Sequence, residues 1–142
     1  MNSATQSVTF QGQSGAIEAL CDAPVGGVVR GTAVIAHPHP LFGGTMQNKV
    51  VQTLARAFVQ CGWQAVRFNF RGVGASAGTY DEGQGETVDM LALVEQVAPT
   101  GPLALAGFSF GAFVTSHVAQ ALQPVRRLDK LVLVGTAASR FT

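Results

Sequence analysis

The sequence has 142 residues, of which 47% are hydrophobic and only 12% are charged, and its formal net charge at pH 7 is +1. This length fits one compact domain over residues 1–142. A chain so rich in apolar residues and so poor in net charge is not typical of a disordered protein. The nine cationic residues are scattered and form a single adjacent pair, Arg126 and Arg127, which argues against a basic surface for nucleic acid.

The sequence predicts neither a membrane span nor a secretory signal. No apolar run approaches the roughly 18 residues that a spanning helix needs, and the first residues lack a basic start followed by an apolar stretch. We therefore expect a cytoplasmic protein without a membrane partner. Cys21 and Cys61 are too few for a disulfide framework and do not form a CxxC pair, so we predict two reduced cysteines that are buried in the packing.

The first predicted elements are strands. Residues 8–21 alternate apolar and polar side chains across a Gly/Ser turn, which predicts an antiparallel hairpin of two edge strands. Residues 31–36 form a short and nearly continuous apolar run, which is typical of a strand covered by helices on both faces.

Helix and strand patterns then alternate to the end of the sequence. Helical spacing of apolar residues, with Gly62 placed to end the first helix, predicts helices at 47–60, 86–97 and 111–122, and short apolar runs predict strands at 63–70, 103–106 and 131–134. This order predicts a three-layer α/β/α sandwich around a mostly parallel sheet, with right-handed crossovers and the antiparallel hairpin at its start. The connection from Arg71 to Gly85 is long and glycine-rich, which predicts a functional loop or a lid.

The sharpest chemical signal is Gly107-Phe-Ser-Phe-Gly111, between a predicted strand and a predicted helix. A nucleophile elbow needs small residues at both ends because the chain turns tightly there and lifts the serine hydroxyl to the carboxyl edge of the sheet. The helix that follows offers backbone N–H groups to a developing oxyanion. The alternative is a glycine-rich turn in which Ser109 only caps the helix.

A second loop, His37-Pro-His-Pro-Leu-Phe-Gly-Gly-Thr45, follows the first buried strand at the same sheet edge. An oxyanion hole on this type of sheet takes one N–H from the residue after the nucleophile and one from such an upstream loop. Phe110 and His39 are the candidate donors, and Leu41 is the fallback because Pro40 has no N–H.

Other chemistries are less favoured. His37 and His39 point to opposite sides of an extended segment and no carboxylate or cysteine accompanies them at ligand spacing, so we expect no metal, and His37 is the candidate for a buried hydrogen-bonded group. The glycines of residues 72–78 miss the spacing of a dinucleotide fingerprint, and we expect no cofactor.

An acidic cluster precedes and enters the middle helix. Negative charge in a first helical turn is favoured by the helix dipole, so a structural role explains Glu86 and Asp89 better than a catalytic pair does.

Three segments together resemble the α/β-hydrolases, and in particular the small lidless esterase-like group related to dienelactone hydrolases. They are HPHPLFGGTMQNKVV at 37–51, VRFNFRGVGASAGTYDEGQGE at 66–86 and LAGFSFGA at 105–112, and the resemblance covers essentially the whole chain. The resemblance implies a serine hydrolase of carboxylic esters or related acyl bonds, with Ser109 as nucleophile and the N–H groups of Phe110 and His39 as the oxyanion hole. A small-molecule acyl substrate would be bound by Leu41, Phe42, Tyr80 and Phe108, beside Phe110.

The sequence departs from this family after Ser109. Family members carry an acid and then a histidine there, whereas this sequence has only Asp129, expected at the opposite sheet end, and His117, about 12 Å along the helix from Ser109. We therefore interpret the chain as an α/β-hydrolase domain that lacks the C-terminal βα units carrying the acid and the base, with His37 or His39 as the one internal substitute for the base.

Two further expectations follow from this interpretation. Strand 131–134 would be left as an exposed apolar edge, which predicts a homodimer, a C-terminal partner or poor solubility. The alternative function is a non-catalytic α/β-hydrolase-like module that uses the pocket, or this edge, for binding.

Overall fold

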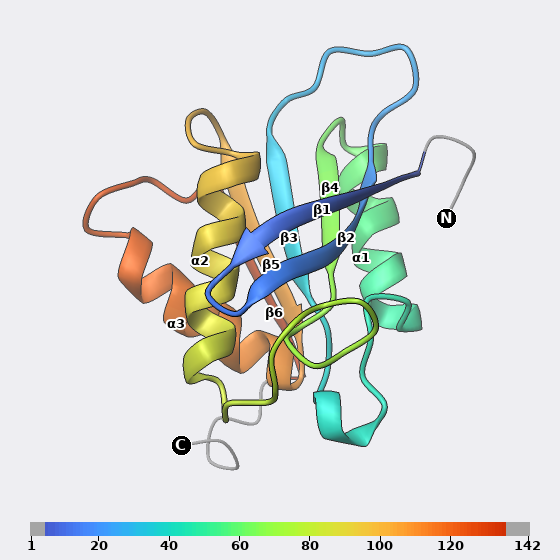
Figure 1. The fold of residues 1–142 in the computed structure, drawn as a ribbon. Helices are drawn as coiled ribbons and strands as arrows, with labels where there is room; N and C mark the ends of the chain where they lie inside the picture. The colour runs from blue at the N-terminus through green and yellow to red at the C-terminus, as the bar shows by residue number, and fades with distance from the viewer. Residues whose placement is uncertain (1–4, 136–142) are drawn as a thin grey trace.

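A six-stranded sheet is the middle layer of the fold (Figure 1). The computed structural model describes residues 5–135, and its strands lie in the order β1-β2-β4-β3-β5-β6. Their bounds are β1 (Gln6–Gly12), β2 (Gly15–Asp22), β3 (Thr32–Ala36), β4 (Gln64–Phe68), β5 (Leu103–Phe108) and β6 (Lys130–Val134). The pairs β3–β4, β3–β5 and β5–β6 are parallel, whereas β1–β2 and β2–β4 are antiparallel.

The predicted hairpin is confirmed, but only one of its strands is an edge. β2 pairs with β1 on one side and with β4 on the other, and its residues are mostly buried or half-buried. The prediction of two edge strands was therefore wrong for β2. Alternation within a hairpin indicates its two faces and does not indicate which other strand will pair with it.

Helices cover both faces of the sheet, as the three-layer prediction requires. α1 (Lys49–Gln60) packs on one face against β3, β4 and β5, while α2 (Gln84–Val97) and α3 (Phe110–Leu122) pack together on the other face (Figure 1). Side chains of β3 alternate between two cores: Ala33 and Ile35 pack with α1, and Val34 and Ala36 pack with α2 and α3. Every residue of β3 is buried, because this strand is covered on both faces.

The ends of α1 follow from local chemistry. The Asn48 side chain accepts the N–H groups of Val50 and Val51 at 2.9 and 3.3 Å, so the helix begins at Lys49 and not at Gln47. Gly62, with a φ of 90°, turns the chain out of the helix as predicted. Cys21 is buried as expected, but Cys61 lies in this turn and is exposed, so its predicted burial was wrong.

The register of β3 and β5 positions the loops that follow them. Ala36 lies beside Gly107, so the segment 37–45 and the turn at Ser109 start as neighbours at the carboxyl edge of the sheet. A short 3-10 helix, η1 (Pro40–Phe42), lies within the first of these loops.

The long connection after β4 is folded back onto the hairpin. The Ala77 N–H donates to the Ala16 carbonyl at 2.8 Å, and the Glu18 carboxylate accepts Asn69 Nδ2 and the Ala75 N–H, each at 2.8 Å. These bonds fix the beginning of the connection on β2, and its later part brings Tyr80 to the ring of His39.

The acidic residues around the start of α2 have structural partners. The buried Glu86 carboxylate accepts the N–H groups of Asp81 and Gly83 at 2.8 and 2.9 Å, and Asp89 pairs with Arg71 at 2.9 Å. The structural interpretation of Glu86 and Asp89 therefore agrees with their contacts.

Within residues 5–135, none of the helices has both the length and the apolar character that crossing a membrane requires.

Candidate functional site

Ser109 lies where β5 ends and α3 begins, in a backbone conformation that L-residues rarely adopt. Its φ and ψ are 58° and −118°, and its N–H donates to the Val134 carbonyl at 2.9 Å. Although Ser109 occupies the N-cap position of α3, its side chain makes no capping hydrogen bond with the helix. A serine that served only as a cap would accept an N–H of the first helical turn, so the capping alternative does not fit this geometry.

The two glycines that flank Ser109 are required by close packing. A Cβ added to Gly107 would collide with the backbone of Gly111, and a Cβ added to Gly111 would lie 2.5 Å from the His37 carbonyl oxygen and collide with the Ala36 carbonyl. The first turn of α3 therefore packs directly on the backbone at the end of β3.

This packing brings the upstream loop against the residue after Ser109. The ring of His39 lies 4.8 Å from the ring of Phe110, which is buried as the first residue of α3. The loop itself is tight, because a Cβ on Gly44 would collide with the Pro38 carbonyl and the Gly44 N–H donates to the His39 carbonyl at 3.0 Å. The structure thus places the side chain of His39 against Phe110, the residue that directly follows Ser109.

His37 is fully buried and both of its ring nitrogens are occupied. Nδ1 lies 2.7 Å from the Pro38 carbonyl oxygen, and Nε2 accepts the Phe70 N–H at 3.0 Å. Burial lowers the pKa of His37 to about 4, against the opposing effect of the Pro38 hydrogen bond. The expectation of a buried hydrogen-bonded group fits this arrangement, and the alternative of His37 as general base does not.

The side chain of His39 holds its own loop. Its Nδ1 accepts the Leu41 N–H at 3.2 Å, and its Nε2 lies 3.2 Å from the Tyr80 hydroxyl oxygen. The Leu41 N–H is therefore already hydrogen-bonded within the loop, which argues against Leu41 as the alternative oxyanion donor. Burial lowers the pKa of His39, while the charge of Glu86 acts in the opposite direction.

The predicted substrate-contacting residues lie at the same sheet edge, with different exposure. Leu41 and Phe42 project from η1, and Phe42 is 83% exposed although its ring lies 4.7 Å from that of His39. Tyr80 is half-buried, with its ring 5.8 Å from that of Phe110. Phe108 is half-buried and lies close to Gly135, at the carboxyl end of β6.

The acid and histidine after Ser109 lie away from it. His117 is exposed on α3, with its ring 4.7 Å from that of Phe113, and Asp129 directly precedes β6 at the opposite end of the sheet. Residues 5–135 contain no cluster of three or more His, Cys, Asp or Glu side chains that could hold a metal ion.

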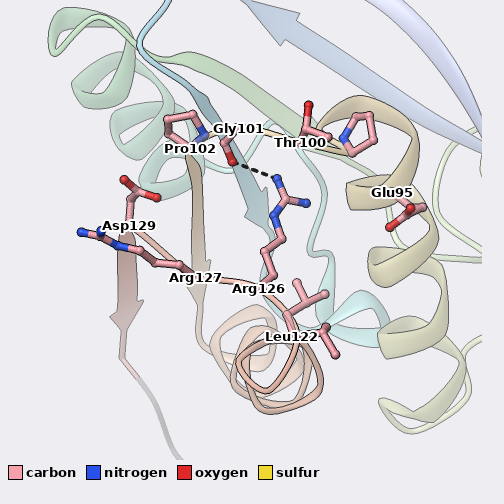
Figure 2. A pocket seen from close by; sticks show the side chains of 10 residues that line it. Glu95, Thr100, Gly101, Pro102, Leu122, Arg126, Arg127 and Asp129 are labelled. Atoms are coloured by element: carbon pink, nitrogen blue, oxygen red, sulfur yellow. Dashed lines mark hydrogen bonds between the residues drawn. The ribbon is translucent and has the colours of Figure 1, made fainter.

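A cavity of about 540 Å³ lies at the other end of the sheet, where β5 and β6 begin (Figure 2). Its lining includes Pro102, Asp129 and Arg126, and the Arg126 guanidinium donates to the Gly101 carbonyl at 3.1 Å. Ser109 is not part of this cavity, which therefore has no role in the chemistry considered at Ser109.

The contact between Tyr80 and His39 was missed by sequence reasoning. The two residues are 41 positions apart and lie on different loops. A pattern of spacing along the chain carries no signal for such a pair, since it depends on how the 71–83 segment folds across β2.

Comparison with known proteins agrees with this geometry. The profile of the serine aminopeptidase (S33) family matches residues 29–140. An α/β serine hydrolase without lid from Xanthomonas campestris is 39% identical, with a TM-score of 0.88, and the match covers 100% of this chain and 66% of that one. An alpha-beta serine hydrolase homologue from Coxiella burnetii is 43% identical, with a TM-score of 0.82 and coverage of 94% and 62%.

A curated relative matches over a shorter stretch. An uncharacterized protein of Rickettsia prowazekii (strain Madrid E) is 42% identical over 90 residues, which are 61% of this chain and 38% of that protein. The present chain thus spans less than two thirds of the length of these relatives. Because the family profile covers most of the chain and agrees with the sheet order and the turn at Ser109, the chain belongs to the serine aminopeptidase (S33) family of α/β hydrolases.

Proposed function

We propose that this chain carries the nucleophile and the oxyanion hole of a serine hydrolase that acts on carboxylic esters or related acyl bonds. Ser109 is the nucleophile, and the backbone N–H groups of Phe110 and His39 are the oxyanion donors. The observation that carries the proposal is the backbone of Ser109, at φ 58° and ψ −118° between two glycines that admit no Cβ. Such strain persists where the surrounding packing enforces it, and it is concentrated at functional sites.

The chemistry follows from these positions. Ser109 Oγ attacks the acyl carbonyl carbon as its proton passes to a general base, and the carbonyl oxygen becomes an oxyanion that accepts the N–H groups of Phe110 and His39. Collapse of this intermediate expels the protonated alcohol or amine and leaves an acyl group on Ser109. Attack by water on that ester releases the acid and restores the serine.

We propose that the general base, and the carboxylate that orients it, belong to residues outside the 142 of this sequence. Both nitrogens of His37 are occupied, Nδ1 of His39 accepts an N–H, and His117 lies on the exposed side of α3. We therefore propose neither His37 nor His39 as the base within this chain. The matched relatives are longer than this chain, which is consistent with such an assignment.

The substrate is proposed by class only. Leu41, Phe42 and Tyr80 form an uncharged rim around the buried Phe110, the residue after Ser109, which suits acyl groups of modest polarity. The Xanthomonas campestris relative is described as lacking a lid, and we propose the same open arrangement for a small esterase-like enzyme of the dienelactone-hydrolase type.

A serine-directed fluorophosphonate probe tests the assignment of the nucleophile. Because the proposed base lies outside this chain, we expect slow labelling of the folded chain, supported by the oxyanion hole alone, and no labelling of Ser109→Ala. Ser116→Ala is the matched control, because Ser116 lies two turns further along α3 with its hydroxyl bonded to the Phe113 carbonyl at 2.7 Å, and it should label like the wild type. Equal labelling of the Ser109→Ala variant, or no labelling of a folded wild type, would reject the proposal.

The second candidate is a non-catalytic binding module. The placement of the three histidines favours it, because none of them is positioned to activate Ser109 within this chain. The two candidates differ in one measurement: a binding module would take up neutral esters reversibly, with equal affinity in wild type and Ser109→Ala, and would form no covalent adduct with the probe.

A further inference from the structure

Tyr80 and His39 join two loops at the candidate site. Tyr80 lies within the glycine-rich segment between β4 and α2, and His39 precedes η1 in the loop after β3. The Tyr80 hydroxyl oxygen lies 3.2 Å from Nε2 of His39, and the two rings are 5.0 Å apart.

The hydrogen bond from the Leu41 N–H determines which group is the donor in the contact between His39 and Tyr80. A backbone N–H can only donate, so Nδ1 of His39, which receives the Leu41 N–H at 3.2 Å, must hold a lone pair. The single proton of the neutral imidazole is then on Nε2, which faces Tyr80. The ring therefore donates to the hydroxyl oxygen, and the proton of the Tyr80 hydroxyl is directed away from His39.

The surroundings of Tyr80 place its side chain near the residue that follows Ser109. Its ring lies 5.8 Å from that of Phe110, the residue after Ser109, and the side chain is only half-buried. Burial and the charges of Glu86 and Glu82 raise the pKa of Tyr80, so the hydroxyl keeps its proton at neutral pH. The neighbouring rim side chains Leu41 and Phe42, and the buried Phe110 between the two loops and α3, have no hydrogen-bonding group.

We propose that the Tyr80 hydroxyl is a specificity-determining hydrogen-bond donor, which selects acyl groups carrying a hydroxyl, ether or carbonyl oxygen beyond the scissile carbonyl, and that the His39 side chain is its positioning residue. This inference rests on the proposed function, because it takes Ser109 as the point of acyl attachment. The scissile carbonyl itself is served by the N–H groups of Phe110 and His39. Tyr80, whose ring contacts that of His39, then serves an oxygen elsewhere in the acyl group.

The first part of the test concerns the tautomer and does not depend on catalysis. In protein labelled with ¹⁵N, assigned with a His39→Gln variant, we expect His39 to be protonated on Nε2 and unprotonated on Nδ1. In Tyr80→Phe the Nε2 resonance should shift while Nδ1 changes little. A neutral ring protonated on Nδ1 would make Tyr80 the donor to His39 and would overturn the inference.

The second part compares two phosphonofluoridate probes of equal chain length, one with an alkyl chain and one with an ether oxygen in that chain. In wild type the ether probe should label Ser109 about fivefold faster, which corresponds to one hydrogen bond of about 1 kcal/mol. Tyr80→Phe keeps the ring and should abolish this preference. Phe42→Leu is the matched control: it alters the same rim without removing a hydrogen-bonding group, and should slow both probes equally and keep the preference.

The outcomes separate the two proposals. A preference for the ether probe that survives in Tyr80→Phe, with a melting temperature close to that of the wild type, would overturn the role of Tyr80 and leave the role of Ser109 intact. If neither probe labels the wild type, the proposed function fails. The role of Tyr80 is then tested by titrating ethyl 3-methoxypropanoate, an ester with an ether oxygen, into wild type and Tyr80→Phe and measuring the affinity from protein chemical shifts. Equal affinity in wild type and Tyr80→Phe would overturn the inference, and weaker binding in Tyr80→Phe would support it.

Discussion

The Phe70 N–H donates to Nε2 of His37 at 3.0 Å and so connects the segment after β4 to the segment after β3. Nδ1 of the same ring lies 2.7 Å from the Pro38 carbonyl and carries the proton of that bond. A protonated His37 would lose the acceptor for Phe70 and would place a charge in a fully buried position. The neutral ring is therefore part of the structure that supports the loop of His39.

This arrangement predicts a loss of stability in mild acid. The folded-state pKa of His37 is lowered from 6.5 to about 4 by burial, so between these values the unfolded chain binds the additional proton. The stabilisation is present above pH 6.5 and is lost as the pH falls toward 4. We expect the free energy of unfolding, measured with urea, to fall by about 2 kcal/mol from this group between pH 7 and pH 5.

His37→Gln is the control for that prediction, since glutamine offers an acceptor to Phe70 and does not titrate. Its stability should be lower at pH 7 and should change less between pH 7 and pH 5. An equal change in the variant and the wild type would show that other groups cause the pH dependence.

Gly111→Ala tests the close contact between α3 and the end of β3. The added Cβ would lie 2.5 Å from the His37 carbonyl oxygen, so the helix must move. We expect a loss of about 3 kcal/mol or more in unfolding free energy, together with loss of fluorophosphonate labelling. Gly27→Ala is the matched control, because a Cβ there meets nothing closer than 3.7 Å, and its stability should stay within about 0.5 kcal/mol of the wild type.

Ser109→Gly tests whether the backbone at this residue is strained. Both Ser109→Gly and Ser109→Ala remove the hydroxyl, but only glycine adopts a φ of 58° with a ψ of −118° at low cost. The strain of about 1 to 3 kcal/mol exceeds the entropy cost of glycine, of about 0.5 to 1 kcal/mol. Thermal or urea unfolding should therefore find Ser109→Gly more stable than Ser109→Ala by about 1 kcal/mol, and the reverse order would contradict a strained turn.

Arg67 on β4 and Asp22 at the end of β2 form an ion pair at 3.2 Å, and neither side chain is exposed. Asp22→Ala would leave the guanidinium charge buried without a counter-charge, because its remaining partners, the Met46 carbonyl and the Gln47 side chain, are uncharged. We expect a loss of about 3 to 5 kcal/mol in unfolding free energy. In the double variant Asp22→Leu/Arg67→Met the loss should be smaller than in Asp22→Ala, since no charge stays behind. A larger loss would mean that the pair itself supplies the stability.

Strand β6 is predicted to mediate self-association. Within residues 5–135 it pairs only with β5, and Leu131 and Leu133 are 41% and 38% exposed on it. A row of unpaired backbone groups with apolar side chains favours pairing with a second copy. Analytical ultracentrifugation should show dimers or larger species that Leu133→Lys reduces. Val25→Lys, at an exposed valine far from β6 along the chain, should leave them unchanged; a monomer at all concentrations would oppose the prediction.

Most of the fold could be predicted because its signals are local. The continuous apolar run that became β3 and the spacing in α1 arise from side-chain periodicity, and the glycines around Ser109 indicate a turn too tight for a Cβ. The errors also have physical causes. β2 became an interior strand through its pairing with β4, and Cys61 was exposed because the helix end turns outward at Gly62.

The order of amino acids was sufficient to determine the layers, the turn that presents Ser109 and the loop expected to face it, since each depends on neighbours a few positions apart. Tertiary structure alone decided the state of the histidines. The neutral ring of His37 accepts the Phe70 N–H, which reaches it from the segment after β4, and the Leu41 N–H at Nδ1 of His39 leaves the proton of that ring for Nε2, which faces Tyr80. Protonation depends on burial and on hydrogen-bonding partners in three dimensions, and such partners are brought together only when the chain has folded.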